Sequence, residues 1–316
     1  MVKLRMPEHI KLIGTNLCCD VSVSGVGETG WRLFWGANWD WDGWVKPQID
    51  LMIGNGVGCN CVRVQGATYA VHKGLIDKTL YLSRWSQIIE YCRDRGVYVY
   101  PCGCTLDADT DTTLPIADIG ATFAEIFLHH QQYQNVIGID VVQEVANADE
   151  AGWSAWKPRM AALIAYIKGG GVTIPLTFSS SEFLDSGYPR LLEVGHLFDH
   201  IDLHPYYRSA EIDDCDPLFA AYPEKDFIIA ESGAEASWTT RENQLIQLRR
   251  MLDLARIGHP QMRGMLVWCT TDPADPALVS GKAWGQYDWD HIPRHDRLNL
   301  IRRYTGGSVV RANRVR

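Results

Sequence analysis

Two glutamates stand at the ends of strand-like segments and are the residues of this sequence best suited to chemistry. Glu144 closes the segment "VIGIDVVQE", and Glu231 lies near the end of "DFIIAES". Two carboxyl groups can cleave a glycosidic bond when one is protonated and the other ionised. The first gives its proton to the leaving oxygen, and the second attacks or stabilises the anomeric carbon. The pair therefore predicts such chemistry, provided that folding brings the two residues together.

Two further side chains would tune these carboxyl groups, and a third would bind substrate. Arg63, in "NCVRVQ", is expected to hold Glu231 ionised, because a cation within a few ångströms lowers a carboxyl pKa by about 1–3 units. Tyr206, in "HIDLHPYY", could donate a hydrogen bond to the same carboxylate. Glu144 has no such partner in this interpretation, so we expect it to keep a higher pKa and to act as the acid. His204 is expected to bind substrate rather than to act as a base.

A tryptophan-rich stretch, "FWGANWDWDGW" (34–44), alternates indoles with carboxylates. An ionised Asp is not buried without a partner, which favours a wet surface loop over a core strand. Sugar rings have flat C–H faces that stack on indoles, and their hydroxyl groups need polar partners. We therefore expect Trp39, Trp41 and Trp44 to bind substrate. The alternative is that these indoles only pack the loops.

The elements that must position these residues alternate between short β-branched runs and longer amphipathic stretches. This rhythm predicts one α/β domain over residues 1–316, a (β/α)8 TIM barrel, whose active site lies at the C-terminal ends of its strands. The strand-like segments are 32–38, 60–65, 97–103, 136–144, 172–179, 200–207, 226–232 and 264–270, and the clearest helical segments are 82–96, 116–133, 154–170 and 240–258.

The two ends of the chain are expected to lie outside the repeating βα units. Residues 1–30 are interpreted as a short N-terminal β-hairpin that closes the barrel floor. An alternative starts the barrel at "KLIGTNL", which shifts the first strand and leaves the chemistry unchanged. Residues 306–316, with several arginines, are interpreted as a basic C-terminal tail.

The segments "GCNCVRV", "VVQEVAN", "DLHPYY", "IIAESG" and "MLVWCT" resemble clan A of the retaining glycoside hydrolases, in particular its cellulase- and mannanase-like members. The resemblance covers residues 31 to 305. It implies a (β/α)8 barrel in which Glu144 is the acid/base and Glu231 the nucleophile. It also implies substrate-binding roles for Arg63, His204, Tyr206 and Trp268, the last as the floor of the central subsite. No metal and no organic cofactor are expected from it.

One residue departs from the clan's pattern. The clan places Asn immediately before the acid/base, where it binds the sugar 2-hydroxyl group, and this chain has Gln143 there. Gln keeps the amide but is one methylene longer, so the sugar identity and linkage stay open. We expect a retaining enzyme that cleaves an oligo- or polysaccharide by double displacement. The alternative is a catalytically altered carbohydrate-binding barrel, for instance as part of a larger particle.

Composition limits the partners. The net charge of −8 and the pI of 5.7 argue against a duplex nucleic acid or an anionic membrane as a partner. No export signal and no run of about 18 apolar residues is evident. The expected location is cytoplasmic or particle-associated, with secretion of a trimmed form left open.

Metal-binding patterns are weak. Nine cysteines do not make a disulfide scaffold in a chain of 316 residues. Cys59, Cys61, Cys102 and Cys104 are expected to be small buried residues of the barrel, a thiolate metal site being the alternative. The acidic segment 107–118 has part of a calcium-loop spacing but lacks its glycine, so a solvated loop is expected.

Overall fold

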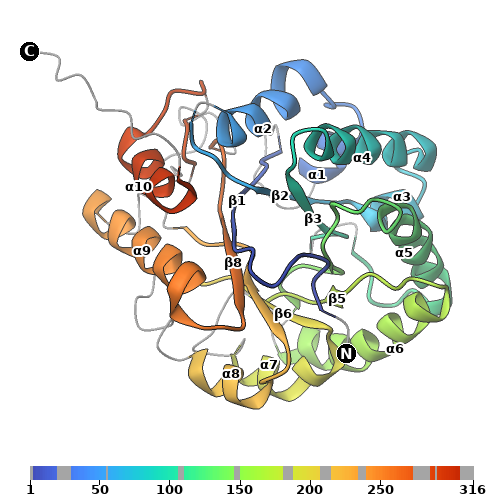
Figure 1. Cartoon of the computed structure of the whole chain (residues 1–316). Helices are drawn as coiled ribbons and strands as arrows, with labels where there is room; N and C mark the ends of the chain where they lie inside the picture. The colour runs from blue at the N-terminus through green and yellow to red at the C-terminus, as the bar shows by residue number, and fades with distance from the viewer. Residues whose placement is uncertain are drawn as a thin grey trace, which may run out of the picture.

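The computed structural model shows a barrel of parallel strands surrounded by helices (Figure 1). It describes residues 3–19, 30–54, 56–105, 110–145, 150–180, 188–206, 215–233, 240–272, 285–288 and 290–306.

The sheet has eight strands, and every strand pair in it is parallel, in the order β5-β4-β3-β2-β1-β8-β7-β6. A parallel bridge between Ser180, beyond β5, and Leu203, in β6, joins the two ends of this order. The predicted (β/α)8 TIM barrel is thereby confirmed. The strands are β1 (Leu12–Asn16), β2 (Cys61–Gln65), β3 (Tyr98–Cys102), β4 (Ile139–Asp140), β5 (Leu176–Thr177), β6 (His200–Leu203), β7 (Asp226–Ile229) and β8 (Met262–Val267).

Helices follow the strands and form the outer layer of the molecule (Figure 1). Those in the described part of the chain are α1 (Gly30–Trp35), α2 (Lys46–Ile53), α3 (Thr68–His72), α4 (Lys78–Arg93), α5 (Ile116–His130), α6 (Glu150–Gly169), α7 (Tyr188–Val194), α8 (Asp216–Ala221), α9 (Arg241–Asp253) and α10 (His295–Thr305). Short turns of π or 3-10 helix are η1 (Trp41–Val45), η4 (Gly195–Leu197) and η6 (Leu254–Gly258).

The first strand differs from the main expectation. Residues 12–16 form β1 and pair in parallel with β2 and β8, whereas much of the predicted strand 32–38 is helix α1. The expected hairpin over residues 1–30 is therefore wrong where the structure describes this segment, and the alternative start at "KLIGTNL" is correct. The physical reason is that a barrel must close: β1 supplies the backbone partners that β2 and β8 need on their facing edges.

Helix α4 illustrates how local signals set the elements. Asp77 precedes it and accepts a hydrogen bond from the Leu80 N–H group at 2.8 Å, which caps its first turn. Gly96 lies in the turn between α4 and β3 and has a φ of 68°. Glycine adopts this left-handed conformation without strain because it has no Cβ atom. Tyr81, Trp85 and Ile89 face inward at helical spacing and are buried.

The core has two layers. Inside the barrel lies a small apolar cluster, and a much larger one fills the space between strands and helices. All nine cysteines are buried, as expected for small interior residues. The inner cluster contains Leu12, Cys61, Tyr100, Ile137, Ile228, Ala230 and Leu266.

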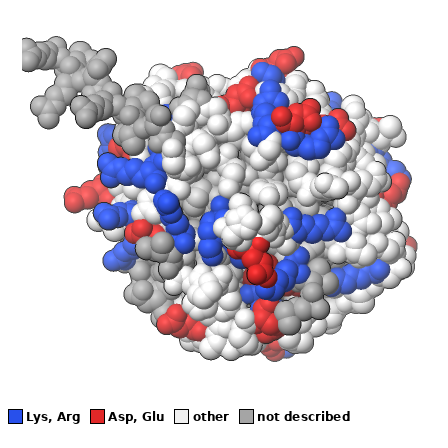
Figure 2. All heavy atoms as spheres, in the orientation of Figure 1, with Lys and Arg blue, Asp and Glu red and all other residues white. Residues whose placement is uncertain are grey.

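Charges are interspersed on the surface. On the face shown in Figure 2, basic and acidic side chains lie among one another. Among the described residues, no helix combines the length and the apolar character that crossing a membrane requires. The predicted basic tail, 306–316, lies outside the described residues beyond its first residue.

Candidate active site

The two predicted catalytic carboxylates lie together at the C-terminal ends of their strands. Glu144 follows β4, and Glu231 follows β7. One oxygen of Glu144, one oxygen of Glu231 and a ring nitrogen of His204 all lie within 4.8 Å of one another. The Glu231 side chain is 2% exposed, whereas the Glu144 side chain is 27% exposed. The two chemically equivalent groups therefore have different environments.

Glu231 is surrounded by hydrogen-bond donors. Gln65 Nε2 donates to its Oε1 at 2.8 Å, and Arg63 Nη1 donates to the same oxygen. The Tyr206 hydroxyl group donates to its Oε2. Donors that converge on a carboxylate stabilise its negative charge, so the arrangement suits a group that must act while ionised.

Arg63 connects Glu231 to the barrel interior. Its side chain is fully buried, and its Nη2 donates to Asp140 Oδ2 at 2.9 Å, while Nη1 also reaches Asn16 Oδ1 at 3.0 Å. Burial alone would lower the pKa of Arg63, but the surrounding negative charges, that of Glu231 first, raise it above its usual value. Arg63 is therefore a permanent cation that serves two carboxylates.

Glu144 has a charged partner that the sequence did not predict. His204 Nδ1 lies 2.9 Å from Glu144 Oε1, so the expectation of an unpartnered Glu144 is wrong. The same nitrogen lies 3.8 Å from Glu231 Oε2. His204 projects from the end of β6 into the space between these two carboxylates, which explains why its role could not be read from its own segment. Glu144 also has a φ of 58°, in the left-handed region.

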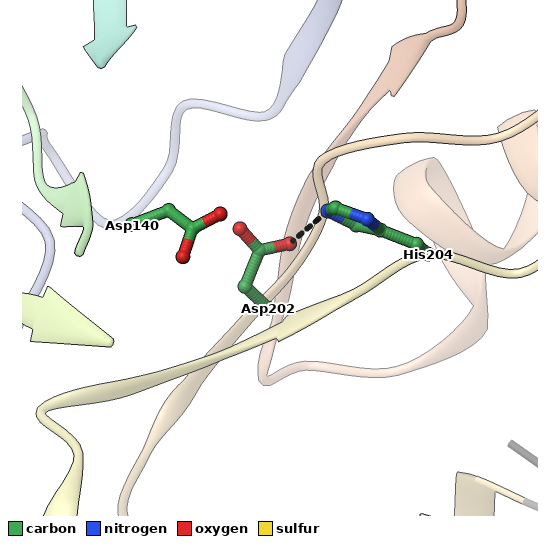
Figure 3. A group of neighbouring side chains, drawn as sticks. All are labelled: Asp140, Asp202 and His204. Atoms are coloured by element: carbon green, nitrogen blue, oxygen red, sulfur yellow. Dashed lines mark ion pairs between the residues drawn. The ribbon is translucent and has the colours of Figure 1, made fainter. Parts of the chain in front are cut away.

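Beneath the mouth lies a second pair of carboxylates, Asp140 and Asp202, both fully buried. Figure 3 shows Asp202 between Asp140 and His204. Burial, together with the nearby charge of Asp202, raises the pKa of Asp140 to about 6. Ser179 donates to Asp140 through its backbone N–H at 3.1 Å and its hydroxyl at 2.7 Å. The mouth therefore rests on a hydrogen-bonded polar floor.

Several residues of this network were not predicted, because the prediction rested mainly on residues at the ends of strands. Asp140 and Asp202 were available as acidic residues inside the apolar runs "VIGIDVV" and "HIDLH", a position that is costly unless the charge is paired. Gln65 follows Arg63 at the next inward position of β2. Asn16 was missed because its strand was not the preferred first strand.

Two further predicted site residues lie next to this cluster in the chain. Gln143 donates its backbone N–H to the Cys104 carbonyl at 2.9 Å, and its buried side-chain oxygen has no hydrogen-bond partner among the described residues. Trp268 follows β8, is buried, and donates its backbone N–H to the Ser232 carbonyl at 2.9 Å. Their contact with a substrate stays a prediction.

The tryptophan-rich stretch lies between α1, α2 and α4. Trp39 stacks between Trp35 and Trp41, with ring centroids 5.4 and 6.3 Å apart. The Trp44 indole N–H donates to the Cys18 carbonyl at 2.8 Å, and its ring lies beside that of His291. The rings thus pack on one another and on the core, and their role in substrate binding stays a prediction. We refer to Trp35, Trp39, Trp41, Trp85 and Tyr91 as the aromatic stack.

In the part of the chain that the structure describes, two groups of side chains have the spacing to hold a metal ion: Asp140, Asp202 and His204, and Glu144, His204 and Glu231. Both would need a neutral His204 nitrogen. Burial lowers the pKa of His204, but Glu231, Asp202 and Glu144 together raise it to about 10. The charges in this cluster therefore favour a proton on His204. In the acidic segment 107–118, two of the aspartates lie outside the described residues, and Asp111 accepts hydrogen bonds from Thr113.

Comparison with solved structures places this barrel among known ones. A GH5_18 from Bifidobacterium longum subsp. infantis matches with a TM-score of 0.69 and 14% identity, over 94% of this chain and 79% of that one. A GH5_18 variant from Streptomyces cattleya, in complex with Manb1-4GlcNAc, matches with a TM-score of 0.72 and 16% identity, over 94% and 80%. An endocellulase from Pyrococcus horikoshii, in complex with cellotetraose, matches with a TM-score of 0.60 and 14% identity, over 93% and 92%.

No family model matches the chain, and neither does any curated protein. At these levels of identity, the likeness to solved structures concerns the fold. The clan A resemblance found in the sequence is confirmed at that level: the chain has the (β/α)8 barrel of the GH5_18 and endocellulase structures.

Proposed function

We propose that the protein is a retaining glycoside hydrolase that cleaves O-glycosidic bonds of an oligo- or polysaccharide. The observation that carries the proposal is the approach of Glu144 and Glu231, whose nearest oxygens lie within 4.8 Å. Retaining enzymes have carboxyl groups about 5–5.5 Å apart, whereas inverting enzymes leave about 6.5–9.5 Å for a water molecule. The short approach supports direct attack on the sugar.

The different environments of the two carboxylates support different roles. Glu231, which accepts hydrogen bonds from Arg63, Gln65 and Tyr206, is the nucleophile: its oxygen attacks the anomeric carbon while the bond to the leaving oxygen breaks. Glu144, which is more exposed, gives its proton to that leaving oxygen. Because His204 contacts Oε1 of Glu144, the other oxygen carries this proton.

The second step returns the enzyme to its starting state. A water molecule attacks the anomeric carbon of the glycosyl ester, Glu144 accepts the proton of that water, and the bond to Glu231 breaks. The sugar leaves with its original anomeric configuration. Gln143, whose side-chain oxygen has no partner among the described residues, is the amide that would meet the sugar beside this bond.

The proposal is tested by incubating the purified protein with a panel of glycosides and sizing the products. Manβ1-4GlcNAc and cello-oligosaccharides belong in the panel, because a GH5_18 and an endocellulase of the same fold are seen with Manb1-4GlcNAc and cellotetraose. The anomeric configuration of the first product, followed by proton NMR, distinguishes retention from inversion.

Glu231→Gln is the decisive variant. It is expected to lower kcat on the order of 10⁴-fold or more while sugar binding, measured by calorimetry, is retained. Glu125→Gln makes the same chemical change on an exposed side chain of α5 and should cleave at the parent rate. Cleavage by Glu231→Gln at the parent rate would show that the nucleophile assignment is wrong. Binding without turnover by the parent would favour the carbohydrate-binding barrel.

A further inference from the structure

The His204 ring bridges two carboxylates at different depths of the barrel. Its Nδ1 lies 2.9 Å from Glu144 Oε1 at the mouth, and its Nε2 lies 3.4 Å from Asp202 Oδ1 beneath. Residues 202 and 204 are two positions apart, so their side chains extend to the same side of the chain. Figure 3 shows Asp202 directed toward the imidazole. The geometry forms a line from Asp202 through His204 to Glu144.

The protonation state of His204 follows from these contacts. Neutral imidazole has one N–H group, so a neutral ring would turn a bare nitrogen toward one of the two carboxylates, whereas the imidazolium ion presents an N–H group to each. The Nε2–Asp202 contact is an ion pair without hydrogen-bond geometry. Both nitrogens of His204 face carboxylate oxygens, and the ring is fully buried. The pKa of about 10, which Glu231, Asp202 and Glu144 maintain against the effect of burial, agrees with this geometry.

Asp202 is itself fixed as a hydrogen-bond acceptor. The Tyr100 hydroxyl donates to its Oδ2 at 2.8 Å, and the Ala230 N–H donates to its Oδ1 at 3.3 Å. His200 Nε2 lies 2.7 Å from the same Tyr100 oxygen. Burial lowers the pKa of His200 to about 4, so this ring is neutral near pH 7. A neutral His200 that donates from Nε2 leaves the Tyr100 proton for Asp202.

Two of the other carboxylates near His204, Asp140 and Glu231, are also paired with a second cation, Arg63. Asp140 and Glu144 approach from the β4 side, and Glu231 approaches from β7. Arg63, from β2, bonds to both Asp140 and Glu231. Asp202 is the carboxylate that faces the inner nitrogen of His204. It is therefore the group whose charge holds the inner proton of the ring.

We propose that Asp202 is a positioning residue, which keeps His204 doubly protonated and thereby fixes a positive charge against Glu144. The inference rests on the proposed function and assigns a role within the same site. The His204 cation favours the carboxylate form of Glu144, which the second step needs as a base. By occupying Oε1, it also leaves the other oxygen to carry the proton that the first step needs.

The proposal is tested by NMR of the full chain with 15N-labelled histidine side chains, in which the shifts of Nδ1 and Nε2 report whether each carries a proton. The chain has ten histidines, and a His204→Gln sample identifies the His204 signals. In the parent, both nitrogens should stay protonated at pH 8. In Asp202→Asn, the pH at which the ring loses its second proton should fall by about 1–3 units.

Asp226→Asn is the matched control. Like Asp202, Asp226 is a buried carboxylate on a strand. It pairs with Arg263 at 3.2 Å and lies at the N-terminal end of β7, away from the mouth. This variant should leave the His204 signals unchanged.

The NMR result does not depend on turnover, so failure of the glycosidase proposal and failure of this inference are distinguishable. A parent His204 ring that is singly protonated at pH 7 would overturn the inference, even if Asp202→Asn does not fold. An unchanged His204 titration in a folded Asp202→Asn variant would overturn it as well.

Discussion

The carboxylate cluster at the mouth and the aromatic stack differ in what holds them together. At the mouth, Arg63, Asp140 and Glu231 are buried charges, and each must be paired because burial of an unpaired charge is costly. In the aromatic stack, Trp35 lies 4.6 Å from Trp85 between ring centroids, and ring-on-ring packing is favourable by itself. A buried charge cluster therefore indicates a function, whereas a group of indoles can be explained by packing alone.

Replacing an arginine by methionine should have a much larger effect on stability at the mouth than at the aromatic stack. Arg63→Met should lower the free energy of unfolding by about 3–5 kcal/mol, because Asp140 and Glu231 would be left buried without their cation. Arg95→Met, at the edge of the aromatic stack, should cost about 1 kcal/mol or less. Arg95 lies over the Tyr91 ring, and its side chain is 40% exposed.

Urea denaturation followed by circular dichroism measures both values. Similar losses for the two variants would contradict the comparison, because they would mean that the buried pair and the exposed cation contribute equally.

Within the aromatic stack, the effect of removing a ring should depend on how deeply that ring is buried. Trp85→Ala should lower the free energy of unfolding by about 3–5 kcal/mol, since the indole is fully buried against Trp35. Trp41→Ala should cost less, about 1–2 kcal/mol, because this ring is partly exposed beside Tyr91. A Trp41→Ala variant with parent stability and a higher Kd for a long sugar chain would instead identify this ring as a substrate platform.

A pH dependence of stability is expected from His204 at the mouth. His204 has a folded-state pKa of about 10, above the unfolded value of about 6.5. Its contribution to stability is therefore complete below pH 6.5 and is lost as the pH rises toward 10. Between pH 6.5 and 8, before thiols titrate, the free energy of unfolding should fall by up to about 1.4 kcal/mol per pH unit.

Urea titrations of the parent and of His204→Gln at pH 6.5, 7.2 and 8.0 measure this slope. The slope should be reduced in the variant. Equal slopes would mean that His204 does not hold an extra proton in the folded state.

The sequence predicted the barrel because β-branched runs and amphipathic stretches alternate along most of its length. It misplaced the first strand because aromatic residues such as Phe34 and Trp35 have high β-propensity, and tertiary packing of α1 against the barrel overrode that preference. The predicted strands 136–144 and 172–179 are reduced to two residues each in β4 and β5. Beyond these residues the pairing continues only as single contacts, such as the bridge between Val136 and Val99.

The site was predicted in its outer part and missed in its inner part. Glu144, Glu231, Arg63 and Tyr206 could be identified because strand ends meet at one mouth of a barrel. The pairing of His204 with both Glu144 and Asp202 could not, since it depends on the angle at which one ring enters the space between two strands. Such an angle is a property of three-dimensional packing and has no counterpart in residue spacing.

The backbone conformation of Glu144 has a consequence for protein engineering. A residue other than glycine in the left-handed region, as Glu144 is at a φ of 58°, costs about 1–2 kcal/mol relative to a relaxed conformation. Glu144→Gly would relieve this cost and, under the proposed function, remove the acid/base at the same time. Selection of this chain for thermal resistance alone would therefore favour loss of the Glu144 side chain, so a stabilisation campaign must screen for the proposed turnover in every round.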